Sequence, residues 1–334
     1  MPKHINWGII GLGNIANKFA QDLLLVKNSV LYGVASRDIE KSKSFAKKYN
    51  SIHYYNSYQE LANDPNIDIV YVATPHTYHF FHTMLCLKSG KAVLCEKPLG
   101  MNSREVITMI ELARSNDLFI MEALWTRFIP GTEKLLELLK SDTIGKIDYL
   151  KADFGFVGNT DPERRVYNRS LGGGSLLDIG IYPIYLSLLL MGLPNILKAT
   201  ANFTPTGVDS FCSILFDYNN GKMAFLESTI LANTPIEAII RGENGSIKMH
   251  RSFHHTKKIS ILKNDNTSET ISIDYKGNGY YHEIVEVMGC LLNKKIESDK
   301  MPHSMSIGLV ETLDKVREQI GLTYPSDVLQ MKKR

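Results

Sequence analysis

The sequence predicts an α/β protein of two domains, a doubly wound parallel sheet over residues 1–124 and a domain with a large, mostly antiparallel open sheet over residues 125–334. Three observations lead to this prediction. Short apolar runs alternate with helical patterns over the first 120 or so residues, a glycine-rich turn follows the first run, and the pattern changes after Trp125. Nearly all-apolar strands between helices are typical of parallel sheets covered on both faces. A chain of 334 residues also suits two domains.

The first domain is expected to follow a regular β-α order. Its expected strands are Ile5–Ile10, Val30–Ala35, Ile69–Ala73, Ala92–Cys95 and Leu118–Met121. Its expected helices are Ile15–Val26, Glu40–Tyr49, Thr77–Lys88 and Ser103–Ser115. Because each strand is followed by a helix that returns the chain to the same edge, the strands are expected to run parallel.

The second domain begins with a mixture of elements. A helix is expected over residues 130–140 and a strand over 147–156. A loop rich in charge and glycine, over residues 161–174, leads into an apolar helix at 175–191. Between about residues 196 and 275, alternating apolar and polar residues with glycine and asparagine turns predict an antiparallel meander. Two helices close the chain, and the last is expected to pack back on the first domain.

Composition excludes several classes of function. The chain has 38 basic and 35 acidic residues, a net charge of only +3, and no block of five like charges. We therefore expect no nucleic-acid partner. Four cysteines lie far apart without a Cys-x-x-Cys pair, so reduced thiols and a cytoplasmic location are expected. The N-terminal residues show no secretory pattern, and the apolar stretch Ile179–Leu193 is short for a membrane span. It is interpreted as a buried helix.

A dinucleotide fingerprint follows the first strand. Gly11 permits a tight turn, Gly13 lets the backbone approach a pyrophosphate, and Ala16 allows close packing of the helix that the motif opens. Asn14 and Ile15, at the start of that helix, are also predicted to bind the cofactor. The phosphates would meet the N-terminus of that helix. A glycine pattern alone is weak evidence, but its place ten residues into a β-α-β pattern predicts nucleotide binding.

The end of the second strand favours NADP(H) over NAD(H). An acidic residue there would bind the ribose 2′-hydroxyl of NAD, whereas this strand ends in Ala35-Ser36-Arg37. Arg37 would face a 2′-phosphate with its guanidinium, and Ser36 would donate a hydrogen bond to it. The plainer alternative makes Ser36 or Asp38 a helix N-cap and Arg37 a surface residue.

Lys97 is the first catalytic candidate. Glu96-Lys97-Pro98 follows the strand Ala92–Cys95 at the carboxyl edge of the sheet, where open parallel sheets bind ligands. Glu96 and Lys97 are predicted to bind the cofactor, and a lysine beside a cofactor there polarises a substrate hydroxyl or carbonyl. The alternative is an ordinary loop lysine before a proline turn.

Tyr182 and Asp178 form the second candidate pair. They are four residues apart in an otherwise apolar helix, so they are expected on one face. A carboxylate and a phenol on a buried stripe need a reason, because burial of unpaired polar groups is costly. Tyr182 would exchange a proton with the reacting oxygen, Lys97 would favour its ionised form, and Asp178 would orient it. The alternative is a Tyr–Asp hydrogen bond that only packs the helix.

Histidines recur at positions 76, 79 and 82. A zinc site needs further ligands at recognisable spacing, and none is evident, so no metal is expected. Thr74, Pro75, His76 and His79 follow a strand at the ligand-binding edge and are predicted to line the cofactor. His254 and His255 are expected at the surface.

Together these motifs resemble the glucose–fructose oxidoreductase, inositol dehydrogenase and rhizopine catabolism family (Gfo/Idh/MocA). The resemblance covers about the first 190 residues. Its markers are Gly11–Ala16, Ala73-Thr74-Pro75 with His79, Glu96-Lys97-Pro98 and the run 172–182. It implies a Rossmann domain, a cis bond before Pro98, and a second domain whose open sheet forms a subunit interface. A homodimer or higher homo-oligomer is therefore expected.

Within that family, the run 122–128 and the tyrosine at 182 are most similar to dimeric dihydrodiol dehydrogenases and NADP-dependent xylose dehydrogenases. Many other members have histidine at the position of Tyr182. The resemblance implies that Lys97 and Tyr182 are catalytic, and that Trp125, Arg127 and Phe154 bind the substrate. An aromatic residue on a strand such as Phe154 is more often part of a core.

The predicted function is NADP(H)-dependent hydride transfer to or from a hydroxyl or carbonyl carbon of a sugar, polyol or cyclic trans-diol. Two alternatives stand beside it. One is a non-catalytic NADP-binding regulator on the same fold, and the other is a different enzyme on this scaffold, such as an NAD-dependent glycosidase or a biliverdin-type reductase. The sequence identifies neither the substrate nor the direction of reaction.

Overall fold

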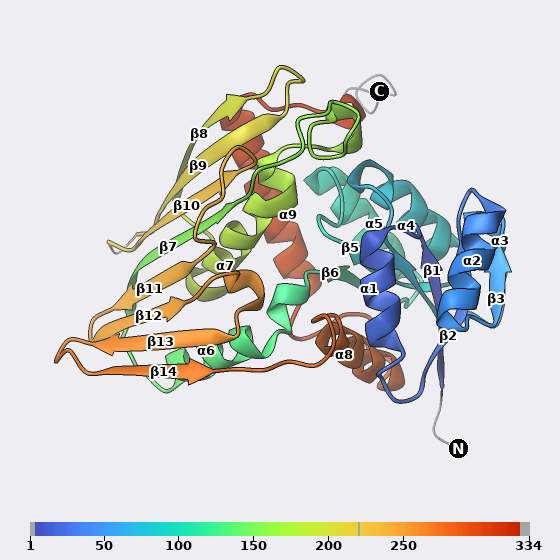
Figure 1. The fold of residues 1–334 in the computed structure, drawn as a ribbon, viewed down its shortest axis with the longest axis horizontal. Coiled ribbons are helices and arrows are strands. Elements are labelled where there is room, and N and C mark those ends of the chain that lie inside the picture. Colours follow the sequence, from blue (N-terminus) through green and yellow to red (C-terminus); the bar gives the residue numbers. More distant parts are fainter. Residues whose placement is uncertain (1–3, 220, 328–334) are drawn as a thin grey trace. The chain divides into compact units, whose positions relative to one another are not determined.

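The computed structural model describes residues 4–219 and 221–327, which form two compact units (Figure 1). Of the described residues, the first unit holds 4–128 together with Lys276–Ile307, and the second holds 129–219, 221–275 and 308–327. The predicted division had a single boundary after residue 124. In the structure the first unit extends four residues further, and it also takes Lys276–Ile307 from the predicted second domain.

The first unit contains a six-stranded sheet of order β3-β2-β1-β4-β5-β6, in which every neighbouring pair is parallel. The strands are β1 (Ile5–Ile10), β2 (Ser29–Ala35), β3 (His53–Tyr55), β4 (Ile69–Val72), β5 (Ala92–Glu96) and β6 (Ile120–Ala123). The doubly wound fold is confirmed, with the short edge strand β3 as an addition. The strand order reverses between β1 and β4, and ligands bind at the carboxyl ends of strands at such a point.

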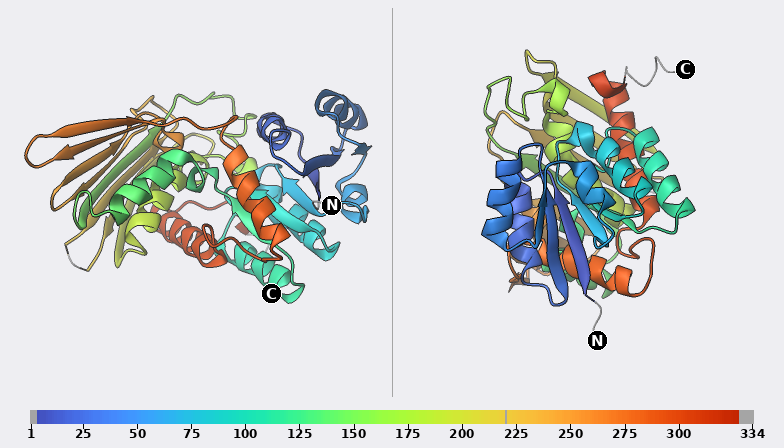
Figure 2. Two further views of the ribbon diagram at one scale, coloured as in Figure 1. Left: turned by 90° about the horizontal axis from the view of Figure 1, so that it is seen from below. Right: turned by 90° about the vertical axis from the view of Figure 1, so that its right-hand side faces the viewer.

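Helices lie on both faces of this sheet (Figure 2). They are α1 (Asn14–Leu23), α2 (Ile39–Tyr49), α3 (Tyr58–Asn63), α4 (His79–Lys88), α5 (Ser103–Ser115) and α8 (Tyr281–Leu292). Because both faces are covered, all four residues of β4 are buried, as are four of the five in β5. This explains why the strands are apolar on both sides.

A buried carboxylate joins α8 to α1. Asp22 of α1 is fully buried, and it accepts hydrogen bonds from the backbone N–H groups of Asn278 at 2.8 Å and Tyr281 at 3.0 Å. Gly277 makes this approach possible, since a Cβ there would lie 2.3 Å from Asp22 Oδ1. These bonds give the buried carboxylate hydrogen-bond partners, and they also satisfy backbone N–H groups before and at the start of α8. They give a physical reason why residues 276–307 belong to the first unit.

The second unit is built on an eight-stranded sheet of order β14-β13-β12-β11-β7-β10-β9-β8. Only β7 and β10 pair in parallel, and the other neighbours are antiparallel. The strands are β7 (Ile147–Gly155), β8 (Ile196–Phe203), β9 (Asp209–Asp217), β10 (Met223–Thr229), β11 (Ala238–Gly242), β12 (Gly245–Met249), β13 (Lys258–Lys263) and β14 (Ser268–Ser272). The predicted, mostly antiparallel open sheet is thus confirmed.

Three helices pack on one face of this sheet (Figure 1). They are α6 (Pro130–Lys140), α7 (Ile181–Met191) and the part of α9 (His303–Ile320) that lies in this unit. Residues Leu176–Gly180 form a π-helical turn directly before α7. The segment Arg169–Met191 is long and apolar enough to span a membrane by length and composition, yet 83% of its most apolar window is buried in the structure. A core helix has the same properties, and a buried helix was predicted here.

Candidate active site

The loop after β1 forms an open cradle for an anion. Gly11 has a φ of +83°, and a Cβ there would lie 2.7 Å from the backbone of Ala73 and Thr74, so the close crossing of the loops requires glycine. Around Gly13 the opposite holds, because no atom lies within 4 Å of a Cβ built there. Gly13 is also the N-cap of α1 without a side-chain cap.

The first turn of α1 completes this cradle. Gly13, Asn14 and Ile15 are all exposed, and the Ile15 side chain is 39% exposed despite being apolar. Ala16 is fully buried against the sheet. Uncapped N–H groups at a helix N-terminus attract anions. The residues therefore fit a dinucleotide pyrophosphate, with Ile15 offering an apolar surface beside it.

The residues after β2 include Asp38, which caps α2, and Arg37, which is an exposed cation. Asp38 Oδ1 accepts hydrogen bonds from Glu40 N at 3.0 Å and Lys41 N at 3.3 Å, and Asp38 N donates to Ser36 Oγ at 3.2 Å. Asp38 is thus the N-cap of α2, as the plainer alternative proposed. Arg37 is exposed, and Ser36 is buried beneath the turn.

Arg37 places a positive charge at the end of β2. His82 lies nearby, and burial lowers its pKa to about 4, with His79 and Arg37 contributing in the same direction. His82 is therefore neutral at pH 7. Its ring packs edge-on against Tyr58 at 4.7 Å, and Arg37 lowers the pKa of Tyr58 against the larger effect of burial. A 2′-phosphate here would meet Arg37 next to an aromatic wall.

The loop after β4 is tied to the loop after β5 by His79. This fully buried ring lies 2.7 Å from the carbonyl oxygen of Pro98 through Nδ1 and 2.8 Å from that of Thr74 through Nε2. Carbonyl oxygens only accept hydrogen bonds, so the ring donates to them from the nitrogens that carry protons. His79, one of the residues predicted to line the cofactor, is fully buried and links the loops after β4 and β5.

The other residues of this loop have separate environments. Pro75 is exposed, His76 is buried with its ring 5.8 Å from that of His79, and Thr74 Oγ1 lies 3.0 Å from His82 Nδ1. Within residues 4–219 and 221–327, no three histidine, cysteine or carboxylate side chains are grouped for a metal.

Lys97 lies on a loop whose backbone N–H groups donate to two acidic residues, Glu96 and Glu122. Glu96 accepts a short hydrogen bond from the Tyr71 hydroxyl and another from Lys97 N at 3.3 Å. The Lys97–Pro98 bond is cis, as the resemblance implied. On β6, Glu122 accepts from Leu99 N at 2.9 Å. Lys97 is half-buried at the carboxyl end of β5, the edge that the sequence predicted.

Glu122 was not among the predicted site residues. Burial raises its pKa to about 7, while the Leu99 N–H, Ser306 and the positive charge of Lys97 act against that rise. A buried acid that titrates near neutrality beside a candidate catalytic lysine is typical of functional sites. Glu122 lies within the family motif 122–128, but no local pattern in the sequence indicates that its side chain is buried.

Trp125 and Arg127 follow β6 in a 3-10 turn of the first unit. The Trp125 indole stacks on Tyr280, with ring centroids 5.1 Å apart and an angle of 9°. Arg127 is mostly buried, and its Nε donates to the carbonyl oxygen of Lys300 at 3.1 Å. Trp125 thus keeps a half-buried aromatic surface, whereas Arg127 also links this turn to residues 276–307.

Tyr182 belongs to an aromatic cluster in the second unit. Its ring lies 4.9 Å from that of His254 and 5.7 Å from that of Phe154, and His254 stacks on Phe154 at 4.5 Å. The expectation that His254 lies at the surface is wrong, because it is only 7% exposed. Its turn is held by Phe253, which is buried and whose N–H bonds to Ile236 O.

Asp178 lies in the π-helical turn that precedes Tyr182. Its carboxylate accepts a hydrogen bond from Arg165 Nη2 at 2.8 Å, and the two form an ion pair in which Asp178 is nearly buried. Arg165 was not among the predicted residues. The widened turn changes the helical spacing assumed for Asp178 and Tyr182, and such turns are frequent at functional sites. The orienting role of Asp178 remains a prediction.

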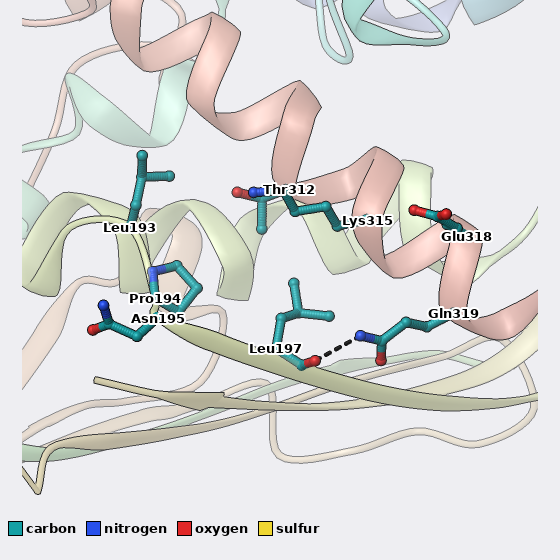
Figure 3. Close-up of a pocket in the computed structure, with 8 residues that line it drawn as sticks. All are labelled: Leu193, Pro194, Asn195, Leu197, Thr312, Lys315, Glu318 and Gln319. Atoms are coloured by element: carbon teal, nitrogen blue, oxygen red, sulfur yellow. Dashed lines mark hydrogen bonds between the residues drawn. The ribbon is translucent and has the colours of Figure 1, made fainter. Parts of the chain in front are cut away.

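A separate cavity of about 290 Å³ lies in the second unit between α9 and the start of β8 (Figure 3). Gln319 closes one side, donating to Leu197 O at 2.6 Å and accepting from Ala199 N at 2.8 Å. None of the predicted site residues lines this cavity.

Comparison with known proteins gives consistent matches over nearly the whole chain. Residues 5–124 match the model of an oxidoreductase family with an NAD-binding Rossmann fold, and residues 132–248 match the GFO/IDH/MocA C-terminal domain. Trans-1,2-dihydrobenzene-1,2-diol dehydrogenase of Mus musculus is 36% identical over 97% of this chain and 99% of its own length. The Homo sapiens protein of that name is 34% identical over the same shares.

Solved structures agree on the fold. A 3-ketoreductase from Actinomadura kijaniata, in complex with NADP and TDP-benzene, superposes with a TM-score of 0.86 at 24% identity, covering 95% of this chain and 98% of its own. An aldose-aldose oxidoreductase from Caulobacter crescentus, complexed with glycerol, gives 0.86 at 21% identity, with coverage of 95% and 97%. At these identities the likeness concerns the fold alone.

Proposed function

Because the chain belongs to the Gfo/Idh/MocA oxidoreductase family, we propose that it moves a hydride between NADP(H) and a hydroxyl- or carbonyl-bearing carbon of a small polyol. The substrate class is a sugar, a polyol or a cyclic trans-diol. The observation that carries this proposal is Tyr182, a buried phenol with aromatic side chains around it, in a chain 36% identical to a dihydrodiol dehydrogenase.

The nicotinamide, when bound, supplies the hydride or accepts it at C4. The protein's own groups handle the oxygen. The Tyr182 phenol exchanges a proton with the substrate oxygen, and the Lys97 ammonium stabilises negative charge on that oxygen and on the phenolate. The Asp178–Arg165 ion pair keeps the turn before Tyr182 in place. The proposal requires Lys97 and Tyr182 to act on the same oxygen, so the effects of removing each are expected to be non-additive.

The preference for NADP(H) rests on Arg37. It is exposed at the end of β2, and Asp38 uses a carboxylate oxygen to cap α2. An NAD-specific site would present an acidic side chain to the ribose hydroxyls at this point. Arg37 instead offers a planar donor set suited to a 2′-phosphate.

The oligomer proposed is a homodimer through the outer face of the eight-stranded sheet. That face carries the apolar residues Tyr149, Leu215, Phe225 and Ile239 with Lys151 among them, and Phe225 is 39% exposed. A mixed apolar and charged face on the side away from the helices suits a self-complementary interface. A cytoplasmic location is supported by four cysteines that are buried and free, as a reducing compartment would keep them.

The deciding experiment measures absorbance of the reduced nicotinamide with NADP or NAD and a panel of pentoses, hexoses, inositols and cyclic trans-diols. K97M and Y182F are each expected to lower kcat by about 10²–10⁴-fold while NADPH still binds. K88M, an exposed lysine on α4, and Y218F, a buried tyrosine of the second unit, are the matched controls and should keep activity.

Other outcomes favour the alternatives. Tight NADPH binding without turnover on the whole panel would favour the non-catalytic regulator. Hydride return to the same substrate, with no net change in the cofactor, would indicate a glycosidase-type enzyme. Full activity of K97M or Y182F would remove that residue from the mechanism.

A further inference from the structure

A buried polar cluster joins β9 and β10 to the start of the helical segment that bears Asp178 and Tyr182. Asp209, the first residue of β9, is fully buried. Its Oδ2 accepts hydrogen bonds from Ser175 Oγ at 2.7 Å and from Leu176 N at 2.7 Å. Ser175 Oγ also lies 2.9 Å from Ser228 Oγ on β10. One carboxylate oxygen thus binds both the side chain and the backbone at the entry to this helical segment.

The glycines on either side of this entry fit closely around the cluster. Gly174 has a φ of +115°, and a Cβ there would lie 2.1 Å from Asp209 Oδ1. Gly180, at the end of the π-helical turn, would place a Cβ 2.8 Å from Ser228 Oγ. The turn that contains Asp178 is therefore in close contact with the cluster at both ends. Because the backbone at Gly174 and Gly180 is packed tightly against the cluster, a change in the Asp209 side chain is expected to shift this turn.

The carboxylate of Asp209 has an unusual electrostatic position. Burial raises its pKa to about 6, and the hydrogen bonds from Ser175 and Leu176 oppose that rise. The partial positive charge of a helix N-terminus also favours its ionised form. The titratable groups that face it are Tyr324, which donates from its hydroxyl to Gly173 O at 2.7 Å, and Cys212 on the same strand. Tyr324 in turn lies near Arg317 and Arg169.

We propose that Asp209 is a positioning residue for catalysis, which holds the Ser175–Gly180 entry so that Asp178 and Tyr182 keep their working arrangement. The inference rests on the proposed function for its activity readout. Ionised Asp209 accepts from Ser175 and Leu176 together, whereas the protonated acid accepts less strongly from both. The entry loosens when Asp209 loses its charge, and kcat falls although the cofactor cradle belongs to the other unit.

The test compares D209N, D209A and S175A, with D217N at the far end of β9 as the matched control. Asparagine keeps an acceptor oxygen without a titratable group. D209A is expected to lower kcat about tenfold or more with NADPH affinity within about twofold of wild type, because small misplacements of reacting groups are costly. D209N is neutral like the protonated acid, so its kcat at pH 7 should already be as low as the value expected for wild type below about pH 6, with no further decline in acid.

Hydrogen exchange of residues 175–191 supplies a readout that does not depend on turnover. Exchange should be faster in D209A than in wild type, intermediate in S175A, and unchanged in D217N. Should D209A fail to fold, S175A carries the test, since it leaves the bond from Leu176 N in place. Wild-type kcat in D209A, or a persisting acidic decline in D209N, would overturn the inference. If the wild type turns over no substrate, hydrogen exchange alone decides. Equal exchange in all variants would overturn the positioning role of Asp209, and faster exchange in D209A would support it, whatever the outcome for the proposed function.

Discussion

Tyr182 and His254 lie with their rings 4.9 Å apart, although 72 residues separate them in the chain (254 − 182), and both rings contact Phe154. The proposed acid–base group, Tyr182, is therefore one of three rings in an aromatic cluster with His254 and Phe154. Such rings contribute packing, and His254 adds a polar edge.

Replacing His254 separates these two contributions. H254A removes aromatic contacts with Phe154 and Tyr182 worth about 0.5–1.5 kcal/mol each, so it should lower the free energy of unfolding, and the loosened cluster should raise KM for the substrate with a smaller loss in kcat. H254F retains the ring and should keep KM close to wild type unless the imidazole itself contacts the substrate. Steady-state kinetics on the preferred substrate provide the measurement, with H250F on the sheet as control. Unchanged KM and kcat in H254A would count against any role of this ring in the site.

Arg37 is expected to set the cofactor preference. R37A should weaken NADPH binding about tenfold or more, because a hydrogen bond between charged groups contributes about 1.5–3 kcal/mol, and it should leave NADH binding almost unchanged. Fluorescence titration with both cofactors measures the ratio. K41A, an exposed lysine in the first turn of α2, tests for a general effect of charge. Equal losses for NADPH and NADH in R37A would argue against recognition of the 2′-phosphate.

Gly11 and Gly13 should differ in what alanine does to them. G11A forces a side chain into a φ of +83° and against Ala73, so it should lower the free energy of unfolding by about 1–3 kcal/mol and impair cofactor binding. G13A meets no atom within 4 Å and should alter stability by less than about 1 kcal/mol. Its Cβ occupies the space over the helix N-terminus, so binding should weaken all the same. Thermal melts and NADPH titrations together decide this, and normal binding by G13A would contradict the cradle.

Glu283 should make stability depend on pH. Both oxygens of this fully buried carboxyl lack a hydrogen-bond partner among the described residues, and burial raises its pKa well above the ordinary value, with Glu96 and Asp22 adding to the effect. The unfolded chain releases this proton above its ordinary pKa while the folded chain retains it. The unfolded state thus binds fewer protons, and stability falls as pH rises.

The variant E283Q replaces the titratable carboxyl with an amide that does not ionise. Its melting temperature should decline less between pH 5 and pH 8 than that of wild type. E311Q, an exposed residue of α9, should follow the wild-type curve. Parallel curves for E283Q and wild type would show that Glu283 does not titrate differently in the folded state.

The first unit was predictable from sequence because its signals are local. Gly11, Gly13 and Ala16 follow a strand at once, and each acts through its own backbone or its immediate neighbours. The arrangement of Asp178 and Tyr182 was less predictable, because the π-helical turn at Leu176–Gly180 depends on contacts with β9 and β10. His254 was misjudged for a similar reason. Its burial comes from Phe154 and Tyr182, which are distant in sequence, and a pair of histidines near a turn has no local pattern that distinguishes buried from exposed.

The division between units shows the same limit. Asp22 lies on a helix whose apolar spacing is clear, yet its partners Asn278 and Tyr281 are more than 250 residues further along the chain. No periodicity links a carboxylate on one helix to backbone N–H groups so remote. Boundaries based on changes of pattern therefore placed residues 276–307 in the second domain, whereas the structure groups them with the first unit.

The chain crosses between the two units at residues 128/129, 275/276 and 307/308. A fragment that stopped at Phe128 would lack α8 and the N–H groups that donate to the Asp22 carboxylate, so the first unit is not a module that one cut could release. Chimaeras that exchange the second unit with a relative would need three compatible junctions, one of them inside α9. Variation during descent is accordingly expected to occur within each unit, through loop and side-chain changes, and not by shuffling of whole halves.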